Sequence, residues 1–176
     1  MKSLGFKELV EWLVIICVWQ VLLLAHRFEW AGPAALTWAM VIIAGLKFCY
    51  FLAENGMHIV TATKSDVPYH YFLMFMAYNI GQMSVSFALD FHVIYTLDRA
   101  SMNGIPEATA GAELLFEFFF YSVLNFSFFG FGEVTPTTVP MKIITLMEVV
   151  MALLTVIFIL GDFISIRESV KSEDKK

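Results

Sequence analysis

Residues 119–136 read FFYSVLNFSFFGFGEVTP, and the rest of the chain is organised around this stretch. It begins with an apolar, aromatic run, continues with Gly-Phe-Gly at 130–132, and ends with an acidic residue and a proline. Glycines at alternate positions allow backbone φ values that are closed to other residues, and they leave room for close approach. Carbonyl oxygens of such a backbone can be turned toward one axis, where they replace the hydration shell of a cation. The stretch therefore predicts a short apolar helix that ends in an irregular, functional loop.

The same residues resemble the pore loop of the potassium-channel superfamily, whose filter reads T-V-G-Y-G. Phe129-Gly130-Phe131-Gly132 take the place of V-G-Y-G, Glu133 follows as the acidic residue, and Pro136 stands where a proline is common. Phe120-Tyr121-Ser122-Val123 resemble the aromatic pair and Ser-Val that often precede the filter. The resemblance covers roughly residues 69–166, a helix–pore loop–helix unit, and it implies a homotetramer around a central path for monovalent cations. The ion-binding filter positions that it implies are Phe128, Phe129, Gly130, Phe131 and Gly132.

One filter position departs from the family pattern, because Phe128 stands where the family has a threonine. Four phenyl rings facing an axis would form a dry, hydrophobic constriction instead of a polar ion site. Three functions therefore stay open. The chain is a potassium-channel-like cation channel, a non-selective cation channel, or a non-conducting regulatory or structural subunit whose filter Phe128 closes.

The composition indicates an integral membrane protein. Of the 176 residues, 59% are hydrophobic and only 15% are charged, whereas soluble domains have about 45–50% apolar and about 25% charged residues. The net charge of −5 provides no basic surface for nucleic acid, so we expect no nucleic-acid partner. The lipid bilayer is the expected surrounding.

The apolar segments predict an all-α fold with four transmembrane helices, at about 9–26, 31–53, 68–97 and 140–166. A re-entrant pore helix at 112–126 and the filter loop lie between the third and the fourth. These 15 residues rise only about 22 Å as a helix, less than the bilayer core of about 30 Å.

The predicted units follow from these segments. They are a transmembrane hairpin at 1–56, a cytoplasmic connection at 57–67, the helix–pore loop–helix unit at 68–166, and a short cytoplasmic tail at 167–176. With both termini inside, seven lysines and arginines lie on the cytoplasmic side and three on the outer side, which agrees with the positive-inside rule. We therefore expect a multi-pass protein of the cell membrane with both termini cytoplasmic.

Two acidic residues near the filter are candidate functional residues. Glu133 would sit at the outer mouth, where a ring of carboxylates concentrates cations. Glu148 is an ionisable residue inside an apolar helix, which marks it as a functional candidate. The preferred interpretation makes Glu148 a brace behind the filter, and the resemblance gives Tyr121 the same supporting role.

The face of the last helix that lines the path has two possible assignments. Helical spacing places Thr145, Glu148, Ala152, Thr155 and Asp162 on one polar face, which could line it. Family spacing instead puts the hinge position at Ala152 and turns the next residues inward. The cavity and gate positions on this second assignment are Ala152, Leu153, Val156, Leu160, Gly161 and Ile164.

Other ionisable residues give weaker patterns. Asp90 and His92 are two residues apart and do not face each other on a helix, so separate contacts with other helices are expected. The four histidines leave a haem-binding or enzymatic helical bundle as a further alternative, although no helix carries a pair suited to axial ligation. We expect no enzymatic activity and no cofactor, with K⁺ or Na⁺ as the permeant ion.

Overall fold

The computed structural model of the chain describes residues 4–62, 69–106, 108–130 and 132–173, with the side chains of 9–57, 73–106, 108–130 and 132–161. The chain is mostly helical, at 82%. Three segments of the described part are long and apolar enough to cross a membrane, namely Leu9–Arg27, Pro33–Met57 and Val139–Gly161. The prediction of a helical membrane protein is confirmed at this level.

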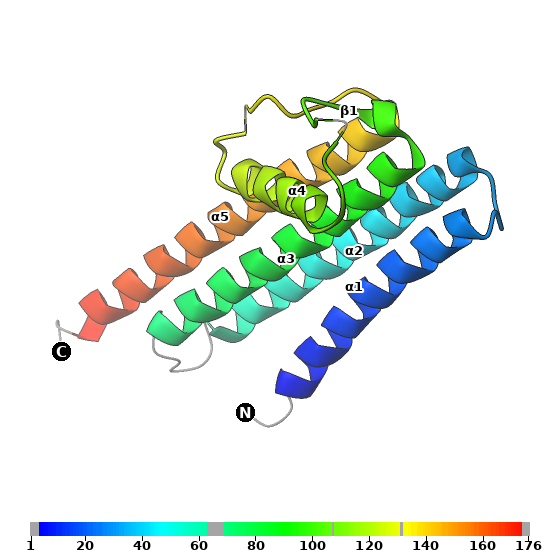
Figure 1. Ribbon diagram of the computed structural model, residues 1–176. Helices are drawn as coiled ribbons and strands as arrows, with labels where there is room; N and C mark the ends of the chain where they lie inside the picture. Colours follow the sequence, from blue (N-terminus) through cyan, green and yellow to red (C-terminus); the bar gives the residue numbers. More distant parts are fainter. Residues whose placement is uncertain (1–3, 63–68, 107, 131, 174–176) are drawn as a thin grey trace.

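Four long helices run side by side, as Figure 1 shows. They are α1 (Leu4–Arg27), α2 (Pro33–Ala62), α3 (Tyr69–Leu97) and α5 (Val139–Glu173). The beginnings of α1 and α3 and the ends of α2 and α5 lie at one end of the bundle (Figure 1). The turn between α1 and α2 lies at the other end, together with the end of α3 and the beginning of α5 (Figure 1), and the short helix α4 (Gly111–Phe126) lies between α3 and α5 in the sequence.

A tight turn joins α1 to α2. Glu29 adopts a left-handed conformation with φ 52°, and the Trp30 amide donates to the Ala25 carbonyl at 3.0 Å. This is the hydrogen-bonding pattern of a helix that closes on a left-handed residue. Pro33 then begins α2 at a position where its missing N–H costs nothing. The turn makes α1 and α2 antiparallel neighbours.

Helix α2 is longer than the sequence indicated. The second span was expected to end near residue 53, with a polar connection at 57–67, but the helix continues to Ala62. Asn55 precedes Gly56, a pair that favours a turn, yet it is buried and accepts a hydrogen bond from Asn79 Nδ2 at 2.7 Å. A partner on α3 therefore outweighs the local turn preference. Residues 63–67 lie outside the described residues.

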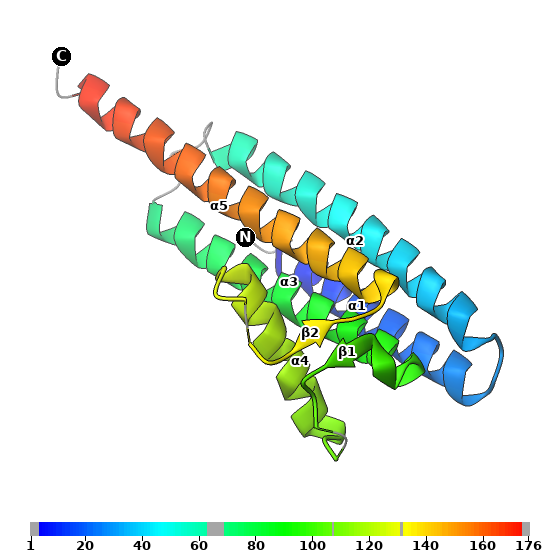
Figure 2. The same ribbon diagram turned by 90° about the horizontal axis from the view of Figure 1, so that it is seen from above.

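The core lies where α2, α3 and α5 pack together, with α1 against α2 and α3. Helix α4 crosses α3 and α5 at a steep angle on another side (Figure 2). Phe118 of α4 is fully buried, with its ring 6.5 Å from that of Phe91 and 5.4 Å from that of Tyr95. Aromatic rings at such distances make favourable edge contacts. They fix α4 against the middle of the bundle.

A small two-stranded sheet, absent from the sequence prediction, ties the two segments that flank α4. After α3, a short helical turn at Arg99–Ser101 leads into β1 (Met102–Asn103), and β2 (Thr135–Pro136) lies before α5. The strands are antiparallel, with Met102 opposite Pro136 and Asn103 opposite Thr135. The chain therefore leaves and re-enters the bundle at one place.

Candidate functional site

Helix α4 positions the loop that carries Gly-Phe-Gly. Its buried residues recur at helical spacing along one face, which packs against α3 and α5: Leu114, Phe118, Tyr121, Ser122, Asn125 and Phe126. Phe116 and Phe120 lie on the opposite, exposed face. The apolar, aromatic sequence gives a helix because one side is bound by the bundle, and the structure extends it over Gly111–Phe126, close to the predicted 112–126.

Glu148 connects α5 to α4 in the interior. Its side chain is fully buried. Ser122 Oγ donates to Oε1, and Asn125 Nδ2 donates to Oε2 at 2.7 Å. Buried carboxyl groups are costly unless hydrogen-bonded, and here both oxygens have partners. Glu148 thus faces α4, on the side where the bracing interpretation placed it, while its role in support of a filter stays a prediction. The sequence had not singled out Asn125.

Tyr121 lies one residue before Ser122 and is also buried. Its hydroxyl is 3.4 Å from Thr145 Oγ1 on α5, and its ring meets that of Phe91 on α3 edge to face at 5.2 Å. Tyr121 therefore holds α4 to both neighbouring helices. Thr145 and Glu148 are three residues apart on α5, and Tyr121 and Asn125 are four apart on α4, so each pair lies on one face of its helix. Two polar contacts, Tyr121 with Thr145 and Asn125 with Glu148, therefore form along the same interface.

The end of α4 has a defined geometry. The Phe129 amide donates to the Leu124 carbonyl at 3.1 Å, and the Phe128 amide donates to that of Asn125 at 3.2 Å. This pair of bonds is the Schellman motif, which places one residue in the left-handed conformation. That residue is Phe128, with φ 57°. Glycine usually occupies this position because a side chain there is strained.

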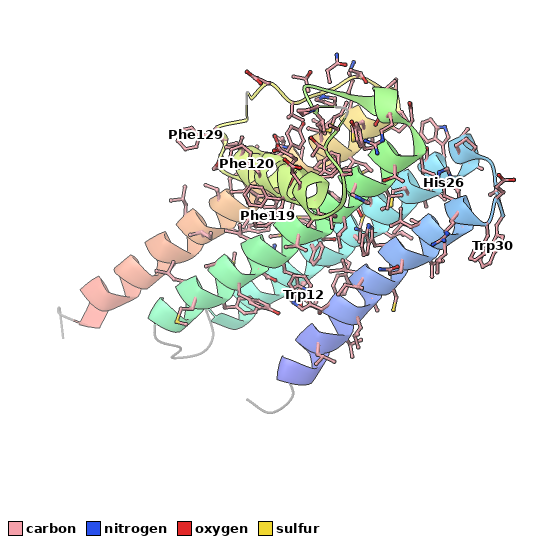
Figure 3. All side chains as sticks on the ribbon, viewed as in Figure 1. Trp12, His26, Trp30, Phe119, Phe120 and Phe129 are labelled. Carbon is pink, nitrogen blue, oxygen red and sulfur yellow. The ribbon has the colours of Figure 1, made fainter. Side chains whose placement is uncertain are left out.

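The aromatic residues beside the glycines face outward in the single chain. Phe129 is 79% exposed and Phe128 is 48% exposed. Figure 3 shows Phe129 projecting away from the helices. At Gly130, a Cβ atom would lie 2.9 Å from Asn125 Oδ1, so the chain turns back onto the end of α4 there. Phe131, another expected filter residue, lies outside the described residues.

A cavity of about 340 Å³ lies beside this loop. Two carboxylate residues, Glu117 of α4 and Glu133 of the loop, contribute to its lining together with Gly130 and Gly132. Glu133 is exposed, and its place at an outer mouth stays a prediction. Glu117 was missed by the sequence analysis. Its spacing from Tyr121 and Leu124, which also line the cavity, could have placed it on this face of α4.

The exit of the loop is fixed to the segment that precedes α4. Thr137 donates from its amide to the Ser101 carbonyl at 2.9 Å and from Oγ1 to the Ala100 carbonyl. Gly104 has φ 89°, and a Cβ atom there would lie 2.1 Å from the Glu133 carbonyl oxygen. Only glycine permits this conformation and this approach. The position of Glu133 therefore depends on Gly104.

The two sets of α5 residues that were assigned to the lining of an ion path differ in their exposure. Ala152 and Thr155 are buried like Glu148, and Thr145 is partly buried, so the polar face is turned into the bundle. Leu153, Val156 and Leu160 are exposed. These exposed residues belong to the second assignment, whereas Ala152, given as the hinge position, is enclosed by the bundle; which face lines a path stays a prediction. Gly161 is exposed, and the side chains of Asp162 and Ile164 lie outside the described residues.

Asp90 and His92 contact different helices, as expected from their spacing. Asp90 of α3 forms an ion pair with Lys47 of α2, which also donates to Ser86 Oγ at 3.0 Å. His92 Nδ1 accepts from Trp19 Nε1 of α1 at 3.3 Å. The ammonium group of the partly buried Lys47 is therefore held between α2 and α3.

Comparison of the chain with models of known protein families and with curated proteins found no match. The geometry of α4, its loop and α5 is therefore the basis for a functional proposal.

Proposed function

We propose that the chain forms a homotetrameric, potassium-channel-like cation channel that conducts through the backbone of Phe129 to Gly132. One observation carries this proposal: the carboxyl group of Glu148 binds two side chains of α4, Ser122 and Asn125, directly ahead of the Gly-Phe-Gly loop. A loop that must hold backbone carbonyls at ion-coordinating distance needs a rigid support. This contact provides one from inside the same chain.

In this proposal α1, α2, α3 and α5 cross the membrane, and α4 enters it without crossing. The 16 residues of α4 rise about 24 Å, less than the core thickness, while the 29 residues of α3 rise about 43 Å. Within the described residues, helix α3 is not among the three candidate spans. Its Asn79, Gln82 and Asp90 are nevertheless buried against neighbouring helices, which is where polar residues of membrane helices lie.

In this proposal the protein lies in the plasma membrane. Both termini and the connection between α2 and α3 face the cytoplasm. The helix ends next to these segments lie at one end of the bundle (Figure 1). Most lysines and arginines belong to the same segments. Glu133 then lies near the outer mouth. No enzymatic step and no cofactor are needed for passive conduction of K⁺ or Na⁺.

The test is the reversal potential of purified protein in a planar bilayer under opposed potassium and sodium gradients. We expect reversal near the potassium equilibrium value. A Gly130→Ala variant should lose the current, because its methyl group would meet Asn125 Oδ1 at 2.9 Å. Gly81→Ala is the matched control, since a Cβ atom at Gly81 meets nothing within 4 Å. Absence of current from intact wild-type tetramers would overturn the proposal, and reversal between the two equilibrium values would make the pore non-selective.

A second candidate function is a non-conducting regulatory or structural subunit. The conformation of Phe128 favours it, since this residue ends α4 in the left-handed region and leaves its ring half exposed beside the loop. A phenyl ring there lacks the hydroxyl group that a polar ion site would use. Current in Phe128→Thr together with none in the wild type would support this candidate.

A further inference from the structure

Two buried carboxyl groups and one partly buried ammonium group gather where α2, α3 and α5 pack. Lys47 of α2 donates to Asp90 Oδ1 of α3. Asp90 is 3% exposed and Glu148 of α5 is 0% exposed. Asp90 is close enough to Glu148 for its charge to act on that carboxyl group. We refer to Lys47, Asp90 and Glu148 as the buried charge group.

The charges of this group do not balance when all three residues are ionised. One ammonium and two carboxylates give +1 − 2 = −1. The other titratable side chain that faces Glu148 is Tyr121 of α4, whose phenol is neutral. Among the side chains that the structure describes, no cation is bonded to Glu148. A net charge enclosed by protein in an apolar surrounding is so costly that such groups are neutralised.

The hydrogen bonds show which carboxyl group is the one to be neutralised. Asp90 has the ammonium group of Lys47 as its partner, so the two form a neutral pair. Glu148 has only uncharged partners, Ser122 and Asn125. The amide of Asn125 donates to Oε2, while the hydroxyl of Ser122 beside Oε1 can either donate or accept. A hydrogen on Oε1 is therefore accommodated without any change in position.

We propose that the buried charge group is a proton-binding site, occupied by one proton that Glu148 carries on Oε1 toward the oxygen of Ser122. Glu148 is then a neutral carboxylic acid that links α5 to α4 through one donated and one accepted hydrogen bond. Loss of this proton places an uncompensated charge between the two helices and weakens their contact. The occupancy of the site thus controls how firmly the loop after α4 is held, and it does so whether or not the chain conducts ions.

The experiment is infrared spectroscopy of the purified protein in lipid vesicles, which separates the C=O stretch of a protonated carboxyl group from the bands of carboxylates. We expect a protonated-carboxyl band in the wild type that is lost in Glu148→Gln, a variant with the same shape and no proton. Glu133→Gln is the matched control, because Glu133 is exposed and outside the buried charge group, and it should keep the band. An unchanged band in Glu148→Gln, or no band in the wild type, would overturn the proposal.

A second variant tests the charge balance with Glu148 intact. Lys47→Met removes the cation that neutralises Asp90, so Asp90 should take up a proton of its own. The spectrum should gain a further carboxyl band, which Lys47→Met combined with Asp90→Asn should lack. If the spectrum of Lys47→Met equals that of the wild type, the balance of buried charge does not decide which carboxyl groups are protonated. That result would refute the proposed proton-binding site, and it requires no measurement of current.

Discussion

Replacement of Gly104 by alanine tests the connection between the segments on the two sides of α4. Gly104 has φ 89°, which an L residue rarely adopts. A methyl group there would lie 2.1 Å from the Glu133 carbonyl oxygen and 2.5 Å from its carbon. Both atoms belong to the backbone, so no side chain can rotate out of the way. The two segments must separate.

The magnitude follows from what that separation breaks. A residue held in a sparsely populated backbone region costs about 1–3 kcal/mol. Hydrogen bonds between β1 and β2, and those from Thr137 to the segment before β1, contribute about 1 kcal/mol each when lost. We expect Gly104→Ala to lower the free energy of unfolding by about 2–5 kcal/mol. The melting temperature should fall by about 5–15 °C for a chain of this size.

The assay is thermal unfolding of detergent-solubilised protein, with protease cleavage within residues 127–138 as a local readout. Gly81→Ala is the control, for which we expect a higher free energy of unfolding. Gly81 lies within α3 with open space around it, so alanine should stabilise the helix by about 0.5–1 kcal/mol. If Gly104→Ala melts and resists protease like the wild type, the close approach to Glu133 is wrong.

Three further substitutions have effects of defined sign, each measured by the same thermal unfolding. Phe128→Gly should raise stability by about 1 kcal/mol, because glycine relieves the left-handed conformation at the end of α4, and a loss would contradict this geometry. Asn125→Ala should lower it by about 1–3 kcal/mol, because it removes a donor from the buried carboxyl group of Glu148, and a neutral result would contradict that bond. Trp19→Phe should cost about 0.5–1.5 kcal/mol by removing the bond to His92 Nδ1, whereas unchanged stability would mean that α1 is held by other contacts.

Much of the helical organisation could be predicted because it depends on local sequence. Four spans were expected from the apolar segments, and three of them, at 9–26, 31–53 and 140–166, coincide with the candidate spans to within about five residues. The fourth, at 68–97, forms the helix α3, which is not among the candidate spans of the described residues, so its crossing of the membrane stays a prediction. The short apolar run before Gly-Phe-Gly likewise gave α4. In both cases the hydropathy and the length of a segment are read from consecutive residues, so the positions of other segments are not required.

Contacts between distant residues were the part that sequence could not give. Lys47 and Asp90 are 43 residues apart, and each alone has several plausible positions in a membrane helix. Their pairing requires the rotation of α2 against α3. The continuation of α2 past Asn55 has the same cause, since Asn79 supplies the bond that a turn would otherwise provide. The left-handed Phe128 also breaks the local rule that glycine fills such positions.

The site itself was predictable in part. Its place inside an apolar helix marked Glu148, and the family resemblance put it behind the loop, but neither could name Asn125 as its partner. The sequence analysis did not identify Glu117, because its place in the cavity lining is apparent only once Glu133, 16 positions later in the chain, is positioned beside it. Residues whose function depends on a second segment are found only when that segment is placed.

The N-terminal hairpin is an integral part of the helix–loop–helix unit that follows. Lipid is as apolar as leucine, so packing and polar contacts, not the exclusion of water, decide which membrane helices associate. Helix α3 makes such contacts on several levels: Gln82 donates to Glu11 of α1 at 3.2 Å, Asn79 donates to Asn55 of α2, and Asp90 pairs with Lys47. Without α2, Asp90 would lose its cation, and the balance of charge behind α4 would change. The hairpin therefore supplies the charge that the following unit lacks, which is a physical reason for its presence in the same chain.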